Sequence, residues 1–125
     1  MPGVTLDTGA LIALERADPR MRAVLDEAHT AGLCIDIPAG ALAQAWRACP
    51  RQGCLARVLH LANVTVPPPD ALSAKASGIL CGPRGTRGPI DASVVLNARR
   101  RDHTVITSDP ADLRLLDAHV RIVQI

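Results

Sequence analysis

The sequence predicts an α/β protein with a mostly parallel sheet covered by helices on both faces. Short, β-rich apolar runs alternate with helical segments along all 125 residues. No internal repeat, low-complexity tract or linker interrupts this alternation, and 48% of the residues are hydrophobic, which is enough for a real core. We therefore expect one domain that covers residues 1–125.

The strands are predicted from five apolar runs that are bounded by turn or helix signals. Pro38 closes the second run, and three consecutive prolines follow the third. In chain order the runs are GVTL (3–6), LCIDI (33–37), VTV (64–66), HTVIT (103–107) and VRIVQI (120–125).

The helices are predicted from apolar residues at helical spacing and from their end signals. Pro19 begins the second helix and Gly32 can end it, while Asp70 is a good N-cap for the fifth and Pro89 lies near the start of the sixth. The helical segments begin at Thr8 and Pro19 and then cover 39–48, 52–62, 70–80, 89–101 and 108–118.

Composition excludes some classes of protein and leaves others open. No apolar run approaches the roughly 20 residues of a membrane span, and the N-terminus lacks the pattern of a signal peptide, so we expect a cytoplasmic protein without a membrane partner. The four cysteines form no Cys-x-x-Cys pair, which favours inert thiols over a zinc site. Arginine dominates the basic residues and binds phosphate well, but GC-rich coding gives the same bias.

Three aspartates fall where the predicted topology brings chain segments together. Asp7 ends the first strand, Asp109 follows the fourth, and Asp91 lies in the first turn of the 89–101 helix. Ligands of open α/β sheets bind outside the carboxyl ends of the strands. Clustered carboxylates repel one another, and Mg²⁺ or Mn²⁺ relieves that repulsion. Such a site is suited to metal-assisted hydrolysis of a phosphodiester.

Each acid also has a structural explanation. Asp7 and Asp109 can cap the helices that follow them, Asp91 can favour the dipole of its helix, and Asp112 stands three residues after Asp109 as in a capping box. The triplet Asp7-Thr8-Gly9 also occurs in dimeric aspartic proteases, but there it lies between strands, whereas here it continues into a helix. The case for a site rests on the set of acids.

Four segments of the sequence resemble the PIN domain family, in particular VapC-like toxin ribonucleases. They are LDTGALIALE (6–15), PAGALAQAWR (38–47), IDASVVLNARR (90–100) and VITSDPADL (105–113). The match covers the whole chain in order and spacing. The resemblance implies a three-layer α/β/α fold, Mg²⁺- or Mn²⁺-dependent endoribonuclease activity, a homodimer, and a small antitoxin whose C-terminal segment covers the active site.

The resemblance also implies roles for individual residues. It makes Asp7, Asp91 and Asp109 acidic metal-site residues. Hydroxyl groups beside them would position phosphate or water, and these belong to Thr8, Thr107 and Ser108.

The sequence departs from the family pattern at Gln44, where a glutamate is usual. The glutamine carbonyl can ligate a metal or orient a metal-bound water, but it supplies neither charge nor base, so we expect weaker metal affinity. Gly88 stands where an additional acid often occurs, and Arg84 and Arg87 in the same loop either contact an RNA backbone or are simply solvated. The run 99–101 of three arginines is expected to complement its helix dipole.

Gln44 motivates an alternative function, a catalytically weak or inactive PIN-like domain that binds RNA or protein. Other chemistries on a similar fold fit less well. A receiver domain needs a lysine after a late strand, and Lys75, the only lysine, follows none. A haloacid dehalogenase-like phosphatase needs an acid where Gly9 stands, and the glycine pattern of dinucleotide binding is absent.

For two apolar features the sequence does not distinguish a position in the core from a position at an interface. Trp46 is expected to pack in the core or at an interface. The apolar first helices, which contain Leu11, Ile12 and Leu14, are plausible dimer contacts.

Overall fold

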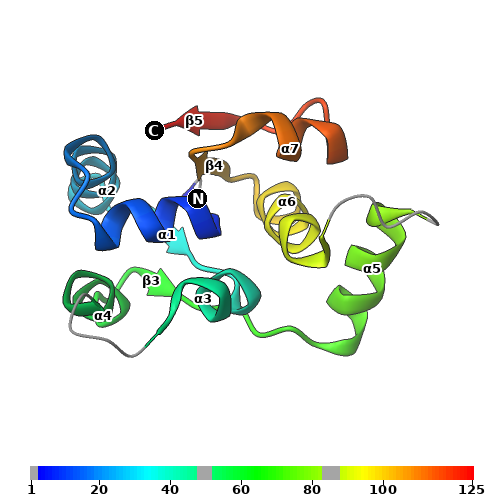
Figure 1. The fold of residues 1–125 in the computed structure, drawn as a ribbon, viewed down its shortest axis with the longest axis horizontal. Helices are drawn as coiled ribbons and strands as arrows, with labels where there is room; N and C mark the ends of the chain where they lie inside the picture. Colours follow the sequence, from blue (N-terminus) through cyan, green and yellow to red (C-terminus); the bar gives the residue numbers. More distant parts are fainter. Residues whose placement is uncertain (1–2, 48–51, 83–87) are drawn as a thin grey trace.

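A computed structural model describes residues 3–47, 52–82 and 88–125. Its five strands form one parallel sheet in the order β3-β2-β1-β4-β5, so the first strand lies in the centre. Strands that are successive in the chain are joined by helical connections (Figure 1). The prediction of an α/β fold with a parallel sheet is confirmed.

The strands are short, and their register places the carboxyl ends of β1 and β4 side by side. Thr5 of β1 is opposite Val105 of β4, and Leu6 is opposite Ile106. The strand bounds are Gly3–Leu6 (β1), Cys34–Asp36 (β2), Val64–Thr65 (β3), Thr104–Thr107 (β4) and Ile122–Gln124 (β5).

The helices cover the sheet in two layers (Figure 1). Helices α1, α2 and α4 lie on one side, α6 and α7 lie on the other, and α5 packs against α6. Their bounds are Thr8–Glu15 (α1), Pro19–Thr30 (α2), Ala39–Ala45 (α3), Gly53–Leu59 (α4), Ala71–Cys81 (α5), Pro89–Arg101 (α6) and Pro110–Leu116 (α7). In the part of the chain that the structure describes, no helix is long and apolar enough to cross a membrane.

The main differences from the predicted elements lie at their ends. The strands predicted at 33–37, 64–66 and 120–125 are shorter in the structure, and α3 ends at Ala45 rather than at 48. Trp46 is the C-cap residue of α3, and its backbone is extended with φ −74° and ψ 127°. The helix predicted at 89–101 is confirmed with both of its ends.

The core is aliphatic and centres on β1, whose four residues are all buried. Leu6, Leu11 and Met21 are fully buried, which places the first two helices firmly against the sheet. Leu11 and Leu14 therefore belong to the core of one chain, whereas Ile12 is only partly buried, and a dimer contact at these helices stays a prediction. Trp46 instead retains 37% of its surface exposed, which excludes the core alternative, and packing at an interface stays a prediction.

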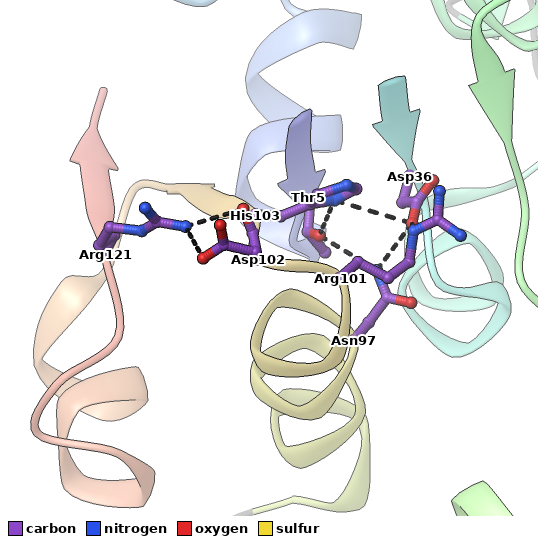
Figure 2. Close-up of polar contacts among 7 residues, drawn as sticks. All are labelled: Thr5, Asp36, Asn97, Arg101, Asp102, His103 and Arg121. Carbon is purple, nitrogen blue, oxygen red and sulfur yellow. Dashed lines mark hydrogen bonds and ion pairs between the residues drawn. The ribbon is translucent and has the colours of Figure 1, made fainter. Parts of the chain in front are cut away.

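A buried polar network lies between the sheet and α6 (Figure 2). Asp36 of β2 has a fully buried side chain, and its Oδ2 atom accepts a hydrogen bond from Asn97 Nδ2 at 3.0 Å and forms an ion pair with Arg101 Nε at 2.9 Å. Asn97 Nδ2 also donates to Thr5 Oγ1 at 3.1 Å, and His103 Nδ1 lies 3.0 Å from the same hydroxyl. The network fixes the angle and height of α6 over the central strands.

Two of the three arginines at the end of α6 have specific partners. Arg101 pairs with Asp36, and Arg99 pairs with Asp117 at 3.0 Å. The expectation that this run mainly complements the helix dipole is therefore incomplete, because two of its side chains hold neighbouring elements.

The charge of Asp36 is expected to be essential for stability. In Asp36→Asn the new amide nitrogen can take one of two positions. At the Oδ2 position it would face the nitrogens of Asn97 and Arg101, and at the buried Oδ1 position it would have no hydrogen-bond partner among the described residues. We expect a loss of about 3 kcal/mol in the free energy of unfolding, measured in urea. The matched control is Asp102→Asn, whose partner Arg121 lies in an exposed ion pair worth at most about 1 kcal/mol. Equal losses in both variants would contradict this role for Asp36.

His103 predicts a pH dependence of stability. Burial lowers the pKa of its imidazole, and this outweighs the attraction of the nearby Asp36 and Asp102 carboxylates, while Arg101 lowers the pKa further. The unfolded chain therefore binds a proton more readily than the folded one, so stability falls as the pH drops below about 6.5. In urea unfolding between pH 7 and pH 5, His103→Asn should lose less stability than the unsubstituted protein. Parallel curves would show that His103 does not cause the dependence.

Candidate active site

Asp7 is placed by the end of β1 and the start of α1. Its backbone N–H donates to the Ile106 carbonyl at 3.3 Å, and its Oδ1 atom accepts from the Ala10 N–H at 2.8 Å. Asp7 is therefore the N-cap of α1, as one of the two explanations of this residue required. The cap uses only Oδ1 in this way, and the side chain is 7% exposed at the edge of the sheet.

Thr107 connects Asp7 with Asp109. Its hydroxyl donates a short hydrogen bond to Asp7 Oδ2 and accepts from the Asp109 N–H at 2.9 Å. The sequence predicted that Thr107 would position phosphate or water. In the structure its hydroxyl positions two of the acids, and a contact with substrate stays a prediction.

The charges of Asp91 and Asp109 both act on Asp7. Burial is the main cause that raises the pKa of Asp7, and the two neighbouring carboxylates raise it further. Hydrogen bonds from Thr107 and Ala10 oppose this shift. The three acids selected from the sequence thus lie close enough at one edge for their charges to interact.

Asp109 does not cap α7 with its side chain. It occupies the N-cap position with φ −132° and ψ 80°, but its carboxylate makes no capping hydrogen bond. The explanation of Asp109 as a cap, and of Asp109 with Asp112 as a capping box, is therefore wrong. The exposed carboxylate of Asp109 points to a role other than capping.

Gln44 joins the site through Thr8. The Thr8 hydroxyl donates to Gln44 Oε1 at 2.7 Å, which links the first turn of α1 to the last turn of α3. The sequence named both residues but contained no sign of this contact, because they are 36 positions apart.

Ser108 and Gly9 are also close neighbours. A Cβ atom at Gly9 would lie 2.3 Å from Ser108 Oγ, so the absence of a side chain at Gly9 leaves room for that hydroxyl. Gly88 precedes α6 in an extended conformation and brings no acid to the site. Arg84 and Arg87 lie outside the described residues.

The chemistry of these side chains suits a hard divalent cation. Such a cation prefers oxygen ligands, and the carboxylates of Asp91 and Asp109 repel the charge of the buried Asp7. Within residues 3–47, 52–82 and 88–125, no group of three or more His, Cys, Asp or Glu side chains is placed to hold one ion. Asp7 is thus the carboxylate whose position is fixed by the most hydrogen bonds, and metal binding by Asp7, Asp91 and Asp109 stays a prediction.

Comparison with solved structures shows that the fold is shared along the full chain. VapBC2 from Rickettsia felis, bound to a DNA fragment from their promoter, has a TM-score of 0.72 at 15% identity and covers 100% of this chain and 99% of that one. DNA-bound VapBC from Salmonella typhimurium has a TM-score of 0.70 at 19% identity and covers 99% and 98%. FitAcB from Neisseria gonorrhoeae has a TM-score of 0.61 at 18% identity and covers 97% and 96%.

These similarities confirm the three-layer PIN-like architecture that the sequence resemblance implied. At these identities they show the fold alone. No protein-family model and no curated protein matches the sequence.

Thr107 is expected to stabilise the site measurably. Thr107→Val keeps the shape of the side chain but removes a buried hydroxyl, which leaves Asp7 Oδ2 and the Asp109 N–H each without one partner. We expect a loss of about 2 kcal/mol in the free energy of unfolding. Thr104→Val, at the other end of β4, is the matched control and should change stability by less than about 0.5 kcal/mol in the same urea titration. A loss no larger than that of the control would remove Thr107 from this role.

Proposed function

We propose that this protein is a metal-dependent endoribonuclease and the toxin of a type II toxin–antitoxin pair. The observation that supports the proposal is the hydrogen bonding of Thr107 to both the Asp7 carboxylate and the Asp109 backbone N–H, at the edge where the carboxyl ends of β1 and β4 meet. The shared fold with VapBC and FitAcB structures supports the same conclusion.

The proposed cofactor is Mg²⁺ or Mn²⁺, held by Asp7 with the charges of Asp91 and Asp109. When bound, the ion lowers the pKa of a water molecule and neutralises charge on the phosphodiester. In the reaction the oxygen of water forms a bond to phosphorus, and the bond from phosphorus to the leaving sugar oxygen breaks. Water gives up one proton to solvent, and the leaving oxygen takes one from solvent.

This chain's own residues would prepare the site for that reaction. Thr107 holds Asp7 and the Asp109 backbone in place, and the Ala10 N–H fixes the second oxygen of Asp7. The hydroxyl of Ser108, which is exposed beside Gly9, is available to contact an RNA phosphate.

The proposed partners follow from the names of the similar structures. VapBC2 and VapBC are each described bound to DNA, and one of these fragments comes from their promoter. We propose that this chain pairs with a small antitoxin, and, from the sequence resemblance alone, that it forms a homodimer and acts in the cytoplasm on RNA.

A second candidate is a binding module for RNA or protein with weak or no catalysis. Gln44 in the place of an acid favours it, as does the lack of a closed three-ligand group among the described residues. Gln44→Glu separates the two candidates, because it should raise cleavage greatly if the missing charge is what disables the site. Unchanged activity in Gln44→Glu would sink this explanation.

The decisive experiment is cleavage of a structured RNA pool by partner-free protein with Mg²⁺, with Mn²⁺ and with EDTA. Cleavage should require metal, and Asp7→Asn or Asp91→Asn should reduce its rate by about a hundredfold or more, since each removes a charge at the metal site. The control is Asp26→Asn on the exposed face of α2, which should cleave like the unsubstituted protein. If folded protein cleaves RNA neither with Mg²⁺ nor with Mn²⁺, the binding module is favoured instead.

A further inference from the structure

The contact between Thr8 and Gln44 assigns a different role to Gln44 from the one expected from the sequence. A glutamine side chain has one oxygen that accepts hydrogen bonds and one nitrogen that donates two. The Thr8 hydroxyl donates to Gln44 Oε1 at 2.7 Å, so the oxygen is already engaged. The nitrogen donates to no other group among the described residues, and the side chain is exposed.

The charges around Gln44 decide what each end of its amide can bind. A hard divalent cation prefers carboxylate oxygens, and Asp7, next to Thr8 in the chain, supplies them. A neutral carbonyl that accepts a hydrogen bond competes poorly as a ligand. A phosphodiester that approaches the three aspartates needs hydrogen-bond donors to offset their repulsion, and the amide nitrogen of Gln44 offers two.

The anchoring of the amide makes this contact selective. Thr8 lies in the first turn of α1 and Gln44 in the last turn of α3, so the hydrogen bond holds a long side chain between two packed helices. A side chain fixed in this way loses less conformational entropy when it binds a ligand.

We propose that Gln44 binds a phosphate oxygen of the nucleic-acid substrate through its amide nitrogen and is not a metal ligand. Thr8 is the positioning residue that turns the nitrogen outward. This inference rests on the proposed function, since it names a substrate contact of the same site.

The test measures the affinity of the protein for Mn²⁺ and its affinity for RNA. Loss of the Gln44 amide should weaken RNA binding if Gln44 contacts phosphate, and Mn²⁺ binding if Gln44 is a metal ligand. Mn²⁺ binding is measured by calorimetry without RNA, and binding of a short labelled RNA is measured by fluorescence anisotropy in EDTA at low salt, where cleavage does not occur. Gln44→Met keeps the length of the side chain and removes the amide. It should weaken RNA binding about fivefold to tenfold, as expected for one charge-assisted hydrogen bond at an exposed site, and leave Mn²⁺ affinity within about twofold.

Two further variants sharpen the result. Gln44→Glu keeps an acceptor for Thr8 but adds negative charge, so it should tighten Mn²⁺ binding and weaken RNA binding. Thr8→Val should weaken RNA binding, and the Thr8→Val/Gln44→Met pair should bind RNA no more weakly than Gln44→Met alone, because both changes remove the same contact. Circular dichroism and urea unfolding show whether each variant is folded.

The outcomes separate this inference from the proposed function. If Gln44→Met weakens Mn²⁺ binding as strongly as Asp7→Asn does, Gln44 is a metal ligand and the inference is wrong. If folded, unsubstituted protein binds Mn²⁺ and RNA but Gln44→Met binds RNA equally well, the inference fails while the nuclease proposal stands. If the unsubstituted protein binds no RNA in EDTA, the inference is wrong, while cleavage of the RNA pool with Mg²⁺ or Mn²⁺ decides the nuclease proposal separately.

Discussion

The parallel pairing of β1 with β4 is the constraint on which the candidate site depends. It brings together two segments about a hundred residues apart, so that Thr107 at the end of β4 reaches Asp7 just beyond the end of β1. Both side chains are buried, and a buried carboxylate is costly unless it is hydrogen-bonded. The hydrogen bonds from Thr107 and Ala10 reduce this cost and fix both oxygens of Asp7 at the edge where we propose that a metal ion binds.

Much of the fold follows from local signals in the sequence. Helix α6 was predicted over 89–101 with Pro89 near its start, and in the structure Asp102 ends it in a left-handed conformation at φ 57°. The ends of β2 and β3 were not predicted, because pairing depends on the partner strand, and β3 offers only Val64 and Thr65. The early end of α3 likewise arises from its surroundings, since its sequence favours further helix up to Pro50.

The site divides in the same way between local and tertiary information. The three aspartates were predictable because strand ends and helix starts are local features, and a parallel topology brings such positions to one edge. The orientation of Gln44 was not predictable, because it depends on how α1 and α3 pack. The orientation of the Asp109 side chain was not predictable either. Its position in the sequence suggested an N-cap, but its carboxylate makes no capping hydrogen bond. Local sequence signals thus select the candidate site residues. Which atom of each side chain faces the site depends on tertiary packing.

Helix α6 joins the candidate site to the buried polar network, and this explains why a small protein retains so many buried polar groups. Asp91 lies near the start of the helix and Asn97 lies six residues later, about 9 Å along its axis. Asn97 is held by both Thr5 and Asp36, so α6 cannot slide or turn without breaking buried hydrogen bonds. An apolar contact at this position would tolerate such movement, because apolar packing is not directional. The network therefore places the charge of Asp91 at a set height above the sheet, beside Asp7 and at the edge where the carboxyl ends of the strands meet.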